Sequence, residues 1–138
     1  MDKALNLLAL ARKAGLAELG EEPVGAAARG LKAHLILVAG NASDHTWRRA
    51  KSFAAGTDQA CVRVKYTKDE MGFIIGRQEL AIAAITDAGM ALSILEALGE
   101  PQKHQDAITV LTEKKQRLQQ RKNEAKAHQK NIRIGKKK

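Results

Sequence analysis

Apolar and polar positions in the first hundred residues follow two periods in turn, one typical of helices and one typical of strands. Leu5 and Leu8 lie on one face of a predicted first helix that Gly15 ends, and LAEL, residues 16–19, is a short extended segment. Pro23 fits the first turn of the next helix, because its missing N–H needs no partner there. The pattern predicts helices at about 2–14, 23–30, 43–56, 67–75 and 87–98, and extended segments at 16–19, 34–40, 60–66 and 80–85.

Capping residues support the starts of three of these helices. Thr67 and Glu70 have the spacing of a capping box, in which each side chain accepts a hydrogen bond from the other residue's backbone N–H. The other candidate caps are pairs of adjacent polar residues, Ser43 or Asp44 and Thr86 or Asp87.

The alternation of helices and strands predicts the fold class. It indicates an α/β protein with helices on both faces of one sheet, an α/β/α sandwich, over residues 1–98. We expect three layers with a mixed central sheet. The polar run GEPQKHQD, residues 99–106, is typical of a linker, and apolar residues return at helical spacing after it. Residues 99–138 are therefore predicted to be a linker and a basic C-terminal arm, helical or disordered.

The charge of the chain is concentrated in this arm. Residues 113–138 hold eleven Lys and Arg against two Glu, which accounts for the whole net charge of +9 and leaves residues 1–112 neutral. Such a like-charged block is solvated, and polyanions are its natural partners; each phosphate that it neutralises adds affinity for RNA without choosing a sequence. A merely solubilising extension stays open as an alternative. Membrane binding is less favoured, because the arm lacks a bulky apolar face.

Composition also excludes several classes of protein. Cys61 is the single cysteine, so an internal disulfide and a cysteine-rich zinc site are excluded, and four scattered histidines predict no metal site. We expect no cofactor. The chain has no apolar run of about 18 residues, so no membrane span is expected. We interpret the N-terminal segment as a domain helix and not a signal peptide, which makes the cytoplasm the expected compartment.

The sequence contains little that predicts catalysis. Ser43, Asp44 and His45 are adjacent, and adjacent residues at a helix start do not face one another, so capping is the better interpretation. Cys61 lies in a strand pattern, where a buried structural thiol is expected. The glycine-rich phosphate-binding motifs are missing from the sequence. We therefore expect a protein that is not an enzyme.

Two long segments carry a resemblance to a known family. They are LLALARKAGLAELGEEPVGAAARGLKAHLILVAGNAS and TKDEMGFIIGRQELAIAAITDAGMA, within about residues 4–97. These segments resemble the ribosomal protein L7Ae family, a kink-turn RNA-binding superfamily, and most of all its small bacterial YlxQ-type members. The arm lies outside the resemblance. The resemblance implies a three-layer α/β/α sandwich that binds RNA, in many members at kink-turns.

The resemblance also implies a site. In the family, RNA is contacted by a loop and helix start written G-x-N-E-x-T-K and by an apolar loop before the last strand. Gly20 matches the glycine, and Glu22, Pro23, Gly25 and Ala26 stand at the asparagine, glutamate, threonine and lysine. A carboxylate at the asparagine position repels phosphate, and the loss of the lysine removes a phosphate contact. The pattern of the fold is therefore kept, while most of the polar RNA-reading residues are replaced. The second loop corresponds to Ile75, Gly76, Arg77, Gln78 and Glu79.

These considerations give one main hypothesis and one alternative. The main hypothesis is a monomeric, non-enzymatic protein that binds structured RNA. Ribosomal RNA is the first candidate ligand, and the ribosome itself is a further one. The alternative is a protein–protein adaptor with a degenerate RNA-binding loop, docking on an acidic partner or the ribosome. We expect Lys13, Arg29 and Lys32 to flank the same rim as the first loop. The candidate RNA-binding residues are Gly20, Glu21, Glu22, Pro23, Lys13, Arg29, Lys32, Ile75, Gly76, Arg77, Gln78, Lys114, Lys115, Arg117, Arg121 and Lys122.

Overall fold

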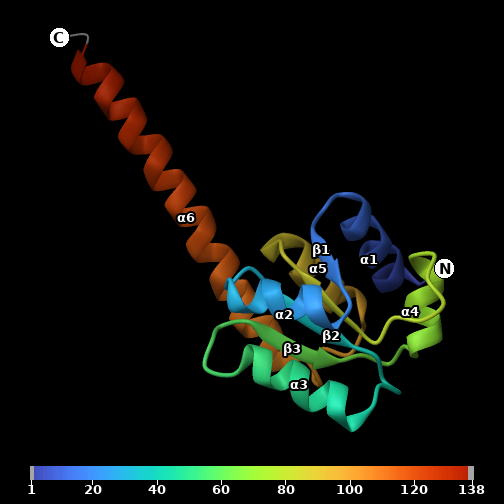
Figure 1. The fold of residues 1–138 in the computed structure, drawn as a ribbon. Helices are drawn as coiled ribbons and strands as arrows, with labels where there is room; N and C mark the ends of the chain where they lie inside the picture. The colour runs from blue at the N-terminus through green and yellow to red at the C-terminus, as the bar shows by residue number, and fades with distance from the viewer. Residues whose placement is uncertain (1, 137–138) are drawn as a thin grey trace.

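The structure, a computed structural model, describes the backbone of residues 2–136 and the side chains of residues 2–125 (Figure 1). Its elements are α1 (Lys3–Lys13), β1 (Ala17–Leu19), α2 (Glu21–Arg29), β2 (Leu35–Val38), α3 (Asp44–Ala54), β3 (Ala60–Arg63), α4 (Lys68–Ile74), β4 (Ile82–Ile85), α5 (Ala88–Ala97) and α6 (Gln105–Lys136).

The four strands form one mixed sheet in the order β1-β4-β2-β3. β2 pairs with β3 in parallel, and β4 is antiparallel to both β1 and β2. Every residue of β2 and β4 is buried, because these two central strands are covered on both faces. The prediction of a mixed central sheet is confirmed.

Helices cover both faces of this sheet, as Figure 1 shows. α2 and α3 pack together on one face, while α1, α5 and the first turns of α6 lie on the other; α4 lies beside α1. The core is aliphatic and rich in alanine, and small side chains let the helices approach the sheet closely. The expected three-layer α/β/α sandwich is therefore confirmed.

The predicted helix starts are present, with the cap now assigned at each. Ser43 caps α3 and Asp87 caps α5, and the capping box of Thr67 and Glu70 is complete. α2 begins at Glu21, two residues earlier than predicted, so Pro23 lies inside its first turn.

The start of α6 packs against the sandwich. Ala107 and Leu111 belong to the hydrophobic core, and Leu111 is fully buried, where α6 contacts α5 and β3. His104, just before the helix, is 3% exposed. The body was expected to end near residue 98, and the structure adds these side chains to its core. That residues 1–98 form the domain by themselves stays a prediction.

Candidate nucleic-acid interface

The candidate residues fall at two opposite ends of the sheet. The loop end comprises residues 20–23 and 75–79, close to where β4 begins, because the Gly20 N–H donates to the Ile82 carbonyl over 3.0 Å. The arm end comprises Lys13, Lys32, the turn before β3 and the root of α6, residues 113–117, close to where β4 finishes. β4 advances about 10 Å between these ends, at about 3.4 Å per residue.

At the loop end, α2 starts with Gly20 as its N-cap and without a capping side chain. Pro23 supplies no N–H, so the backbone donors pointing out of this helix start are those of Glu21 and Glu22. The Glu21 carboxylate accepts from the guanidinium of Arg49 in α3, which offsets its negative charge. Glu22 is exposed. One of the two carboxylates at this helix start is therefore already paired within the protein.

The residues at the family's threonine and lysine positions have a structural explanation. Gly25 is buried against the Phe53 ring of α3, and a Cβ at this position would lie 3.0 Å from Phe53 Cζ. α2 thus packs closely on α3, and a larger side chain here would push the Phe53 ring aside. Ala26 is exposed on the outer side of α2, and its methyl group offers no hydrogen bond. Neither residue provides a polar contact to RNA.

The second loop is held firmly against α4. A Cβ on Gly72 would lie 2.5 Å from Glu79 Cα, so the backbone of the loop lies directly on the helix. Ile75 is buried in the core, whereas Gly76, Arg77 and Gln78 are exposed. Arg77 is thus the exposed cation of this loop.

The structure separates Lys13 from the rim of the first loop, whereas the side chains of Arg29 and Lys32 lie along α2. Lys32 lines one surface hollow together with Pro23 and Ala26. α2 runs from the loop end to the arm end, so Lys32 follows its C-terminus, about 13 Å along the helix from Glu21. Lys13, at the end of α1, also lies at the arm end, where the Thr86 N–H donates to the Leu16 carbonyl. The guanidinium of Arg29 folds back along α2 beside Gly25.

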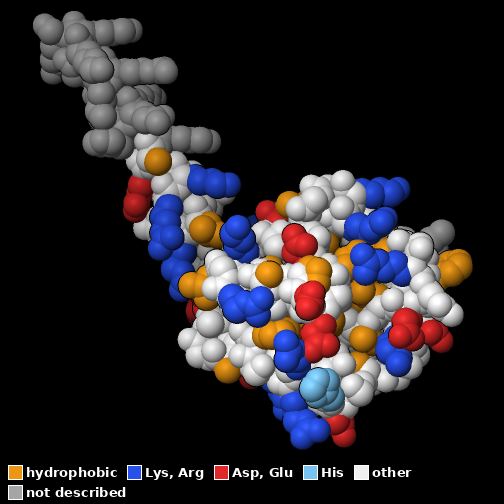
Figure 2. All heavy atoms as spheres, viewed as in Figure 1, with side chains coloured by type: hydrophobic (Ala, Val, Ile, Leu, Met, Phe, Trp, Pro, Cys, Tyr) orange, Lys and Arg blue, Asp and Glu red, His pale blue; other side chains and the backbone are white. Residues whose placement is uncertain are grey.

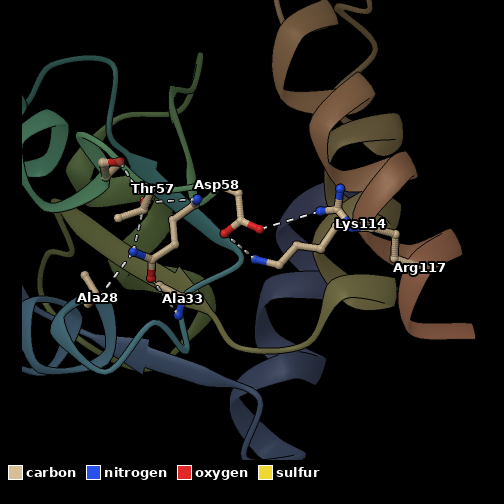
Figure 3. A network of polar contacts seen from close by, with 8 residues as sticks. Ala28, Ala33, Thr57, Asp58, Lys114 and Arg117 are labelled. Carbon is tan, nitrogen blue, oxygen red and sulfur yellow. Dashed lines mark hydrogen bonds and ion pairs between the residues drawn. The ribbon is translucent and has the colours of Figure 1, made fainter. Parts of the chain in front are cut away.

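The root of α6 is fixed at the arm end by ion pairs with Asp58, in the turn before β3 (Figure 3). Lys114 Nζ lies 3.3 Å from Asp58 Oδ1, and Arg117 Nη2 lies 3.6 Å from Oδ2. The Lys114 side chain is only 12% exposed. The buried Gln59 side chain anchors this turn, because it donates to the Ala28 carbonyl and accepts from the Ala33 N–H.

Beyond this root the arm presents unopposed positive charge. Lys115, Arg121 and Lys122 are exposed, and in the described part of the chain they have no ion pair. Figure 2 shows mainly Lys and Arg among the charged side chains along the described part of α6, with an acidic side chain close to its grey end, whereas both signs are interspersed on the body. His34 lies near Lys114, and burial, with help from that cation, lowers the pKa of its imidazole, so it stays neutral at pH 7. The basic side chains after residue 125 lie outside the described residues.

α3 and the end of β3 add cations that were not among the sequence-based candidates. Arg63 Cζ and Lys51 Nζ lie 5.0 and 5.3 Å from the centroid of the half-buried Trp47 ring, within the range of cation–π contacts. Arg49, besides binding Glu21, lies 5.4 Å from the Phe53 ring. The run WRR was the available sequence signal, but only the fold places it beside α2 and β3.

The structure offers little support for a catalytic or metal centre. The Ser43 side chain accepts from the Thr46 N–H as a helix cap, and His45 is exposed beside it. Burial raises the pKa of the Cys61 thiol to about 12, so the reactive thiolate is scarce at pH 7. Within residues 2–125, no cluster of three His, Cys, Asp or Glu side chains is placed to hold a metal ion. None of the described helices is long and apolar enough to cross a membrane.

Comparison with known proteins agrees with this architecture. The chain is 31% identical over 96 residues to the RNA-binding protein YlxQ of Enterococcus faecium, a match that covers 70% of this chain and 91% of that protein. A Bacillus halodurans protein of unknown function superposes with a TM-score of 0.67 at 25% identity, over 72% of this chain and all of the other. A 15.5 kD RNA-binding protein of Giardia lamblia superposes with a TM-score of 0.58 at 16% identity, over 70% of this chain and 82% of the other. No family model matches the chain.

The fold, a four-stranded mixed sheet with helices on both faces, is the fold of these two solved structures. The 31% identity over 91% of the Enterococcus faecium protein confirms the resemblance to the L7Ae family that the sequence showed. The chain belongs to the L7Ae family, among its YlxQ-type members.

Proposed function

We propose that this protein binds structured RNA without catalysing a reaction, as a monomer in the cytoplasm, and that ribosomal RNA is its first candidate ligand. The family membership supports RNA as the partner. The observation that carries the proposal is the arm end, where exposed Lys115, Arg121 and Lys122 continue from a rigidly anchored helix root. A row of cations on a fixed axis binds phosphates through counterion release.

The two ends have different tasks in this proposal. The arm end holds phosphates, because its cations outnumber its acids. The loop end selects the shape of the RNA through Gly20–Pro23 and the loop 75–79. Glu22 accepts a hydrogen bond from a guanine edge there, and Arg77 contacts the backbone. Because the ends are separated by the length of the sheet, they contact different segments of one RNA.

One observation favours a second candidate function, the protein–protein adaptor. The side chains at the family's RNA-reading positions are Glu22, Pro23, Gly25 and Ala26, and none of them is a cation. In this alternative the loop end has no RNA ligand, and the arm docks on an acidic partner or on the ribosome.

A gel shift with the full chain distinguishes these functions. A kink-turn RNA and a straight duplex of equal length are compared at about 0.15 M salt, where non-specific contacts are weakened. Arg77→Gln tests the loop end, and the triple variant Lys115→Gln, Arg121→Gln and Lys122→Gln tests the arm end. Lys103→Gln is the matched control, because Lys103 is exposed and precedes α6.

The proposed function predicts tighter binding of the kink-turn than of the duplex. Arg77→Gln then reduces this preference, the triple variant weakens both complexes, and Lys103→Gln changes neither. Equal binding of both RNAs, lost in the triple variant, would restrict the RNA contact to the arm. Absence of any complex even at low salt would contradict RNA binding and leave the adaptor.

A further inference from the structure

Phe73 is the most exposed of the large hydrophobic side chains within residues 2–125. It is 82% exposed, against 63% for Leu31 and 53% for Leu10. It lies near the end of α4, on the side of the molecule where α4 packs beside the N-terminal end of α1 (Figure 1). A single exposed ring is common on protein surfaces, so the side chains around it decide whether it marks a site.

The fold does not need this ring. α4 is attached to the core through Met71 and Ile75, which are buried, and through Gly72, which contacts the backbone of Glu79. Phe73 is not part of the hydrophobic core or of the partly buried shell around it. A polar residue would therefore keep α4 in place equally well.

Phe73 borders a groove between α1 and α4. The groove is an open hollow of about 530 Å³. Its apolar floor is formed by the half-buried Leu5 and Ile74, and the exposed Phe73 ring stands at its border. Leu5 also borders the core beneath α1, so the floor continues inward from the groove. The remaining lining residues are Asp2, Asn6, Asp69 and Glu70.

The charge of this groove is opposite to that of the chain. Three carboxylates line it and no Lys or Arg does, although the chain as a whole carries +9. The carboxylate of Asp2 stays ionised, since it accepts from the N–H groups of Ala4 and Leu5 and from the Tyr66 hydroxyl. Asp69 and Glu70 lie one turn before Phe73. Lys68, the lysine of α4, does not line the groove; its Nζ atom lies 4.0 Å from Glu79 Oε2.

We propose that the groove between α1 and α4 docks an amphipathic helix of a partner protein, one whose apolar side chains are flanked by Lys and Arg. The apolar side chains of that helix cover Phe73 and Leu5, and its cations meet Asp2, Asp69 and Glu70. Nucleic acid fits this groove poorly, because three carboxylates repel phosphate. The groove is therefore a protein-docking surface separate from the arm, and this inference does not depend on RNA binding.

The test uses the full chain and a model helix as the probe. A fluorescein-labelled peptide of about 14 residues, with leucine at helical spacing and lysine elsewhere, is titrated by fluorescence anisotropy. A peptide with glutamate in place of lysine is the charge control. Phe73→Ala removes the ring, and Asp69→Lys reverses one charge without touching the core. Leu10→Ala is the matched control, since Leu10 is an exposed apolar side chain of α1 outside the groove.

The proposal expects binding of the lysine peptide and not of the glutamate peptide. Phe73→Ala and Asp69→Lys each weaken it by about tenfold, and Leu10→Ala by less than about twofold. Raising the salt concentration reduces the effect of Asp69→Lys but keeps that of Phe73→Ala.

Three results would overturn it. In the first, the lysine peptide fails to bind, or binds with an affinity that neither groove variant changes. In the second, light scattering finds concentration-dependent self-association that Phe73→Ala abolishes, which would make a second copy of the chain the occupant. In the third, Phe73→Ala weakens RNA binding as strongly as peptide binding, which would make the groove a nucleic-acid surface.

Discussion

Asp58 Oδ1 and Lys114 Nζ lie 3.3 Å apart and join the turn before β3 to the root of α6. This contact helps to hold the direction of the arm, together with the packing of Leu111, because the Lys114 side chain is almost enclosed and its partner stands on the turn that Gln59 anchors. The arm therefore leaves the sandwich at the end of the sheet opposite to Gly20 and Arg77. An RNA that contacts the arm and the loop end together has to extend along the body.

Replacing Asp58 by Asn should loosen the root of α6. The pair is partly exposed, so the free energy of unfolding should fall by only about 0.5–1 kcal/mol. Amide hydrogens of residues 111–117 should exchange faster, and RNA affinity should rise slightly because a carboxylate near the phosphates is removed. Glu113→Gln is the control, since Glu113 is exposed on the same helix and has no ion pair in the described part of the chain. Unchanged exchange in the Asp58 variant would show that other contacts fix the arm.

Leu111 should be indispensable for the docking of α6. Its side chain is fully buried, so Leu111→Ala should lower the free energy of unfolding by about 2–5 kcal/mol, measured by urea denaturation. Leu118→Ala, on the same helix but exposed, should change it by less than about 0.5 kcal/mol.

The same reasoning predicts the result of shortening the chain. Ending it after residue 98 removes His104, Ala107 and Leu111 from the core and should destabilise the body strongly. Ending it after residue 120 keeps these contacts and should leave the melting temperature nearly unchanged. Equal melting temperatures for the two shortened chains would contradict a structural role for the start of α6.

The exposed cations of the arm should determine how RNA binding depends on salt. Replacing Lys115, Arg121 and Lys122 together by Gln should reduce the slope of log K against log salt by about 2–3, because each lost phosphate contact accounts for about 0.7–0.9. Lys103→Gln should leave the slope as it is. A variant that loses affinity at constant slope would indicate that these residues act other than through phosphates.

Cys61 should be inert in the folded protein. Burial raises its pKa from 9.0 to about 12, so at pH 8 its reaction with a disulfide reagent should be about two to three orders of magnitude slower than in urea. The unfolded state ionises first as the pH rises, so the stability contributed by this group should decline between about pH 9 and 12. Cys61→Ala should remove that part of the decline. A native rate close to the unfolded one would contradict the raised pKa of this half-buried thiol.

Local sequence patterns predicted most of the secondary structure. The capping box of Thr67 and Glu70, the run LILV of β2 and the Pro23 turn are all determined by near neighbours, because capping, periodicity and φ restriction act over a few residues. The position of the net charge was likewise evident from the sequence. The alternation of helices and strands also predicted the α/β/α sandwich, which the structure confirms.

Only the tertiary structure decided which residues meet. Lys13 lies at the arm end because α1 finishes there, and Lys32 because it follows the C-terminus of α2; the direction of a helix in space cannot be read from spacing alone. The pairing of Glu21 with Arg49, the contact of Gly25 with Phe53 and the burial of Leu111 all join elements distant in the sequence. Such contacts depend on how helices pack on the sheet. The sequence by itself determined the elements and the charge of the arm, whereas packing decided where that arm leaves the body and which carboxylates remain free at the loop end.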